Sequence, residues 1–136
     1  MGARSALLAL LLIGGCSPGR RTPETPAGRL AGIYRRRGAG ESDKLEISAA
    51  GRKSVRFKVV VQTLTMGGHS CSLEGSAWEE KGVWVYMDRT PGEVFGKICR
   101  LELRASADAI ELRDAGTCVE YCGAGQRLDG IRFPRN

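Results

Sequence analysis

The four cysteines in the second half of the chain and a lone histidine are the residues whose chemistry could define a site. The cysteines are Cys71, Cys99, Cys118 and Cys122, and the histidine is His69. Thiolates and imidazole can bind zinc, but cysteine ligands of structural zinc usually come in closely spaced pairs, whereas two of these are isolated and the last two are spaced C-x3-C. The spacing disfavours zinc, and we predict no metal site.

Catalytic patterns are also missing from the residue types and their spacing. His69 and Ser70 are neighbours, and neighbouring residues on a strand point to opposite faces, so they make a poor base and nucleophile. A thioredoxin-type redox site would need a C-x2-C pair beside a helix start. Carboxylates lie among basic residues, as Glu102 does between Arg100 and Arg104, and form no acid/base pair. We therefore predict a protein that is not an enzyme and has no cofactor.

Alternation of apolar and polar residues indicates the elements that position these side chains. The clearest case is 54–63, where Val55, Phe57, Val59 and Val61 share one face. Segments with a similar pattern are 28–37, 44–48, 69–80, 82–89, 97–106, 109–116 and 128–134. Short connections rich in turn formers favour hairpins, so we predict an all-β antiparallel meander of about eight strands, closed or nearly closed into a barrel. A two-sheet sandwich is the alternative.

An even number of cysteines in an exported protein predicts two disulfides, with three possible pairings. If 97–106 pairs with 109–116 around a turn near Ala107, Cys99 lies opposite residues 116–118. This register favours Cys99–Cys118 and leaves Cys71–Cys122 as the second bridge.

The amino terminus indicates export. Arg4 precedes an apolar run over 6–13 and two glycines, a pattern typical of a signal peptide and too short for a permanent membrane helix. Ile13-Gly14-Gly15-Cys16 resembles the lipobox of bacterial lipoproteins. The resemblance implies that residues 1–15 are removed and that Cys16 carries acyl chains, several of which together anchor a protein stably. An ordinary signal peptide with a structural cysteine is the alternative.

The segment after Cys16 is rich in proline and has no apolar residue larger than alanine. We interpret 16–27 as the lipidated cysteine and a flexible tether, and 28–136 as the folded barrel domain. In lipoproteins, a serine rather than an aspartate after the cysteine implies the outer membrane. We therefore expect a lipid-anchored outer-membrane protein that faces the periplasm.

The formal net charge of +6 suits an anionic membrane or polymer, and export makes nucleic acid an unlikely partner, so we predict none. Arg35, Arg36 and Arg37 form the densest basic cluster, which could contact anionic lipid headgroups or cell-wall carboxylates, or could be a solvated strand end. We predict that Trp84 and Tyr86 are partly exposed and anchor a protein partner.

The stretches CSLEG, CRLEL, CVEYCG and LDGIRF look like a cysteine-patterned module of proteobacterial envelope proteins, a resemblance that implies a location but no activity. The architecture as a whole is loosely similar to that of small β-barrel lysozyme inhibitors. We expect a non-enzymatic binding module in the periplasm, with lysozyme inhibition as the alternative. A carrier of a small apolar ligand is a weaker alternative, because the inward Val, Leu, Ile and Phe residues look sufficient to fill the barrel.

Overall fold

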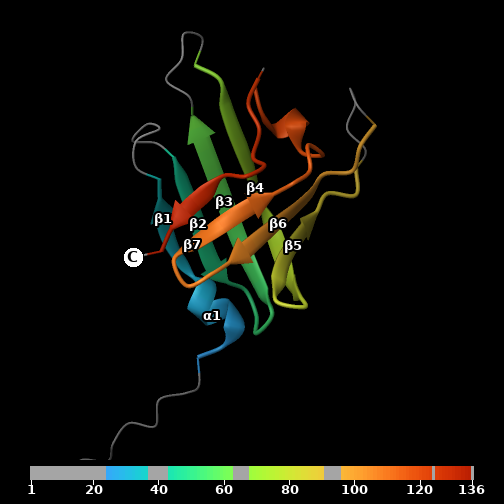
Figure 1. Ribbon diagram of the computed structural model, residues 1–136. Coiled ribbons are helices and arrows are strands. Elements are labelled where there is room, and N and C mark those ends of the chain that lie inside the picture. The colour runs from blue at the N-terminus through green and yellow to red at the C-terminus, as the bar shows by residue number, and fades with distance from the viewer. Residues whose placement is uncertain (1–23, 37–42, 63–67, 91–95, 124, 136) are drawn as a thin grey trace, which may run out of the picture.

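The computed structural model describes residues 24–36, 43–62, 68–90, 96–123 and 125–135, which form one antiparallel sheet rolled into a nearly closed barrel (Figure 1). Each strand pairs with the next along the chain, from β1 to β8. This confirms the predicted meander and favours the barrel over the sandwich. The elements are α1 (Pro26–Leu30), β1 (Gly32–Arg35), β2 (Lys44–Ala49), β3 (Ser54–Gln62), β4 (Ser70–Glu80), β5 (Val83–Met87), β6 (Arg100–Ala105), β7 (Ala109–Arg113), η1 (Val119–Tyr121) and β8 (Arg132–Pro134).

Inward side chains fill the barrel. On β3 the predicted inner face is at most 3% exposed, while Arg56 and Lys58 on the same strand point to solvent. Other side chains of the interior that are fully buried are Leu45, Leu101, Leu103, Ile110, Leu112, Leu128 and Phe133. A barrel of eight strands is just wide enough to be filled in this way, so the packing weighs against a ligand held inside.

The base of the barrel is covered by the helix α1. The sequence predicts a flexible tether up to residue 27 and a strand from residue 28, so the helix is a correction to both. Thr25 caps this short helix with its hydroxyl, and Pro26 occupies the first turn. Ala27 and Leu30 are at most 2% exposed, and the Ala27 amide donates to the Arg52 carbonyl at 3.3 Å. The prediction failed here because a five-residue helix is too short to show helical periodicity. Within the described ranges, no helix has the length and hydropathy needed to cross a bilayer.

The opposite end of the barrel carries both disulfides. Cys71 is bonded to Cys122 across 51 residues, and Cys99 to Cys118 across 19. The predicted pairing is confirmed. The bridges tie the irregular segment that contains η1 to β4 and to the start of β6.

A tyrosine and a carboxylate add a polar link at this end. The Tyr121 hydroxyl donates a short hydrogen bond to the Asp88 carboxylate, and the Asp88 amide donates to the Cys99 carbonyl at 2.9 Å. The bond from Tyr121 lowers the pKa of Asp88 and raises that of Tyr121. This end of the barrel is therefore fixed by covalent and polar contacts, whereas α1 covers the base with apolar side chains.

The seam of the barrel lies between β1 and β8, which are side by side but form no ladder among the described residues. The Arg135 guanidinium crosses toward the base and donates to the Arg29 carbonyl, Nη2···O 3.0 Å. The Arg135 amide donates to the Asp108 carbonyl of the β6–β7 turn at 2.8 Å. Because successive residues of a strand direct their peptide nitrogens to opposite sides, the nitrogen of Pro134 faces the seam, and it carries no hydrogen.

Candidate functional site

The arginines of the predicted basic cluster, Arg35 to Arg37, do not share one environment in the structure. Arg35 is exposed, and Arg37, like Cys16, lies outside the described residues. The Arg36 guanidinium forms an ion pair with the fully buried carboxylate of Asp43, with Nε···Oδ2 at 2.8 Å and Nη2···Oδ2 at 2.6 Å. The second oxygen of Asp43 accepts from the Gln62 amide at 2.8 Å. Arg36 thus joins the ends of three strands, and its contact with a partner stays a prediction.

The two predicted aromatic anchors, Trp84 and Tyr86, also differ in their exposure to solvent. Tyr86 is half-buried, as expected, but Trp84 is only 4% exposed, so the prediction of partial exposure is wrong for Trp84. Trp78, on β4, is instead 55% exposed. Trp78 pairs with Val85, which places both on the outer face and turns Trp84 and Tyr86 inward. The inner face accepts these two rings because β4 offers Gly75 and Ala77 there.

Exposed apolar side chains gather on the outer face around β5. Four large apolar side chains are exposed in the described part of the chain, and three of them belong to β4, to β5 and to the segment that leads into β6: Trp78 at 55%, Met87 at 39% and Ile98 at 45%. Val85 lies between Trp78 and Met87 and is almost covered. We call Trp78, Met87 and Ile98 the apolar strip.

Arginines border this strip on β6. Met87 pairs with Arg100, whose guanidinium contacts Glu102; Arg104 binds the other oxygen of Glu102, with Nη2···Oε2 at 2.6 Å. Hydrogen bonds from Arg100 and then Arg104 lower the pKa of Glu102. Both guanidinium groups are thereby paired with Glu102 on the strand beside the apolar strip.

The sequence contained a signal for this strip that our reading did not use. Trp78 falls on the face of 69–80 that is otherwise polar, whereas both faces of 82–89, including the one that holds Met87, are apolar. A tryptophan at an outward position is uncommon unless something covers it, because an exposed large apolar group often marks a binding surface. The strand pairing, which the sequence does not state, decided which aromatic residues face outward.

The rest of the described chain offers little chemistry beyond this surface. All four cysteines outside the amino terminus are in disulfides, and His69 is exposed at the start of β4. No group of three or more His, Cys, Asp or Glu side chains in the described part of the chain is placed to hold a metal ion. Comparisons with protein-family models, with curated proteins and with solved structures found no match to this chain.

Proposed function

We propose that this protein is a non-enzymatic binding module, anchored by acyl chains on Cys16 to the outer membrane, which receives a protein partner on the apolar strip in the periplasm. The observation that carries this proposal is that Trp78, Met87 and Ile98 are exposed on neighbouring segments of the sheet, next to two arginines paired with Glu102. Tryptophan, methionine and arginine are enriched at protein interfaces, and tryptophan and arginine dominate their binding energy.

The arginines strengthen the argument because binding does not have to order them. Long side chains lose rotamer freedom when a partner immobilises them, which weakens association. Arg100 and Arg104 are already held by Glu102 in the free protein. A partner with an apolar centre and an acidic rim would meet a surface that is largely preorganised.

The anchored location is supported by two independent features. The lipobox-like residues 13–16 imply the acyl anchor, and disulfides persist in oxidising compartments such as the periplasm. The filled interior favours a surface that binds over a carrier that encloses an apolar ligand.

Photo-crosslinking in the bacterium that makes the protein would test the binding surface. A photoreactive phenylalanine analogue replaces Trp78 or Met87 in the full chain, and Arg132, exposed on the outer face of β8, is the control position. We expect the same discrete partner at positions 78 and 87 and no such product at position 132. Equal crosslinking at all three positions would argue against a specific surface.

The partner found in this way is then titrated against purified variants. Trp78→Ser should weaken binding by at least about 30-fold, since a central tryptophan typically contributes about 2 kcal/mol or more. Its unfolding free energy should stay within about 0.5 kcal/mol of the parent, as is usual for exposed positions. A partner whose affinity is unchanged by both Trp78→Ser and Met87→Ser does not bind this strip.

Lysozyme inhibition, the alternative function, is tested with purified protein that lacks the acyl anchor. The mature chain carrying Cys16→Ser is titrated against several lysozyme classes, with binding heat and residual muramidase activity recorded together. Submicromolar binding with loss of activity would identify lysozyme as the partner. Absence of binding to every class would remove lysozyme and direct the search to other envelope proteins.

The anchor has its own test. Cys16→Ser should leave the chain unprocessed or release it from the outer membrane, because the acyl chains would have no attachment site. Fractionation of cells that make the parent and the variant checks this. An outer-membrane fraction that still retains processed variant would show that something other than lipid holds the protein.

A further inference from the structure

Cations outnumber carboxylates on the outer face of β1–β3 but not on that of β6–β8. On the outer face of β6–β8, four arginines lie within ion-pair distance of four carboxylates: Arg100 and Arg104 with Glu102, Arg113 with Glu111 and Asp129, and Arg132 with Asp108. The outer face of β1–β3, together with Glu74 beside it on β4, has four cations against two carboxylates. We call this second set the basic face; it consists of Arg35, Lys44, Arg56 and Lys58 with Glu46 and Glu74.

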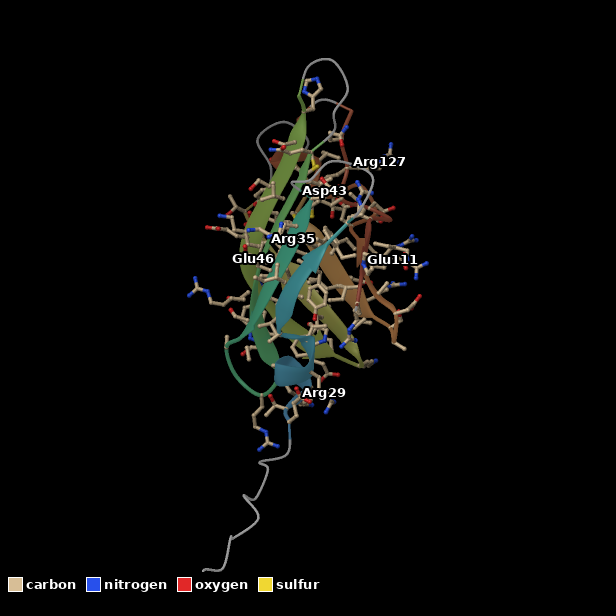
Figure 2. All side chains as sticks on the ribbon, turned by 90° about the vertical axis from the view of Figure 1, so that its left-hand side faces the viewer. Arg29, Arg35, Asp43, Glu46, Glu111 and Arg127 are labelled. Atoms are coloured by element: carbon tan, nitrogen blue, oxygen red, sulfur yellow. A yellow bond between two sulfur atoms is a disulfide. The ribbon has the colours of Figure 1, made fainter. Side chains whose placement is uncertain are left out.

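The cations of the basic face are less neutralised than those of β6–β8. Arg35 and Arg56 make no ion pair in the described part of the chain, and Lys58 reaches Glu74 at only 3.7 Å. Glu46 pairs with Lys44, and the charges of Lys44, Lys58 and Arg35 contribute to lowering its pKa. Figure 2 shows Arg35 and Glu46 close together on β1 and β2. A positive field therefore remains on this side for an outside anion.

An exposed apolar side chain sits within this positive surface. Ile33 is 65% exposed, the largest exposed fraction among the large apolar side chains of the described residues, and it pairs with Glu46 across β1 and β2. It borders a groove of about 560 Å³ whose charged lining residues are Arg56, Lys58, Glu46 and Glu74. Cations around an apolar side chain suit the boundary between lipid headgroups and acyl chains.

The point at which the described chain begins places this face near the proposed anchor. The helix α1, which precedes β1 directly, packs against β2 at the base of the barrel. Figure 2 shows Arg29 of α1 below Arg35 and Glu46. Cys16 stands eight residues before Glu24, the first described residue, and eight residues span at most about 28 Å. A lipid-anchored barrel would thus be held close to the membrane surface, next to the strands that carry the basic face.

We infer that the basic face lies against the anionic bilayer surface in which Cys16 is anchored, with Ile33 at the level of the headgroups. This inference rests on the proposed anchor and adds an orientation to it. Met87 and Ile98 lie on β5 and on the segment before β6, across the barrel from β1, and would face the periplasm, whereas Trp78 lies on β4, diagonally across from Arg56. The two surfaces would then have separate ligands: lipid phosphates on one side and a protein on the other.

Vesicle binding without the acyl chains tests this orientation. The mature chain with Cys16→Ser and both disulfides intact is sedimented with vesicles of phosphatidylcholine, either pure or mixed with phosphatidylglycerol. We expect binding to the mixed vesicles that weakens in high salt, and little binding to pure phosphatidylcholine. Equal binding to both vesicles, or none to the anionic ones at millimolar lipid, would overturn the inference.

Two triple variants with the same net charge show whether binding to anionic vesicles depends on the basic face or only on the total charge of the protein. The basic-face variant carries Arg35→Gln, Arg56→Gln and Lys58→Gln; the control carries Arg104→Gln, Arg113→Gln and Arg132→Gln. We expect the basic-face variant to lose about 100-fold in partitioning, or about fivefold for each charge removed at an anionic surface, and the control far less. Equal losses would overturn the inference.

The contribution of Ile33 and that of the acyl anchor are measured in separate experiments. Ile33→Ser should weaken partitioning into anionic vesicles several-fold, whereas Trp78→Ser should leave it unchanged; the reverse result would assign the bilayer to the apolar strip and overturn the inference. Because the vesicle assay uses no acyl chain, its failure would leave the anchor itself untouched. Failure of the anchor would appear instead in the fractionation of the Cys16→Ser variant.

Discussion

Gly75 lies directly beneath the ring of Tyr86, so closely that a Cβ atom on Gly75 would stand 2.4 Å from Cε2 of the tyrosine. The ring therefore rests on the bare backbone of β4 and meets Phe57 edge to face, with 5.4 Å between ring centroids. A contact of this kind requires glycine for space and not for an unusual backbone angle.

Gly75→Ala should lower the free energy of unfolding by about 1–3 kcal/mol, because the added methyl group overpacks the interior. Urea unfolding measures the change. Tyr86→Leu removes the ring, so the same glycine substitution should be much less harmful in that background. If the two losses simply add, the ring is not what Gly75 accommodates.

Arg36→Gln should destabilise the protein, since it leaves the buried Asp43 carboxylate without its guanidinium partner. A hydrogen bond to a charged group contributes about 1.5–3 kcal/mol, and we expect a loss of this size. Arg35→Gln, one residue earlier and exposed, is the matched control and should change stability by less than about 0.5 kcal/mol. Chemical denaturation of both variants makes the comparison, and similar losses would contradict the assignment.

The two disulfides should differ in their contribution to stability. In the chain-entropy description, a bridge across 51 residues contributes about 4 kcal/mol and one across 19 residues about 3 kcal/mol. Replacing Cys71 and Cys122 together by alanine should therefore lower the unfolding free energy more than replacing Cys99 and Cys118.

Mass spectrometry of the unreduced parent, from Ser17 onward, should find no free thiol. Two or more free thiols would mean that a predicted bridge does not form, and would remove the basis for this comparison.

Stability should fall in acid partly through Glu102. The hydrogen bonds from Arg100 and Arg104 lower the pKa of Glu102 below its ordinary 4.5, so its stabilisation is present above pH 4.5 and is lost as the pH falls through the lowered value. Glu102→Gln should flatten this part of the pH profile, with an effect of about 1 kcal/mol or less. Glu80→Gln, at an exposed glutamate without an ion pair in the described residues, should leave the slope unchanged. Parallel denaturation curves from pH 7 to pH 3 make the test.

The strands could be predicted from sequence because a barrel with one wet and one packed face imposes a period of two, and 54–63 shows that period except at Val60. The cysteine pairing followed from the same hairpin logic, since the register of β6 with β7 brings Cys99 toward Cys118. The helix α1 could not be predicted, because its stability comes from burying Ala27 and Leu30 against the barrel and not from a local pattern.

The candidate surface was harder to predict than the fold. Around β5 both faces are apolar, so alternation alone could not tell which of them, the one with Trp84 or the one with Val85, faces the interior. The two are distinguished by the small residues of β4 that face inward, which become informative only when the partner strand is known. The structural role of Arg36 was missed for a similar reason: its partner Asp43 is seven residues away and buried only once β1–β3 are paired.

Pro134 affects whether copies of the protein can associate through the edge of β8. The last strand of an incompletely closed sheet can recruit a strand from a neighbouring molecule, and such pairing leads to aggregation. At the edge of β8 the peptide nitrogen of Pro134 has no hydrogen to offer, and the adjoining Arg135 is already committed to Arg29. If the protein is anchored as proposed, copies confined to a membrane plane would collide often, and Pro134 removes one of the donors that pairing between their edges would use.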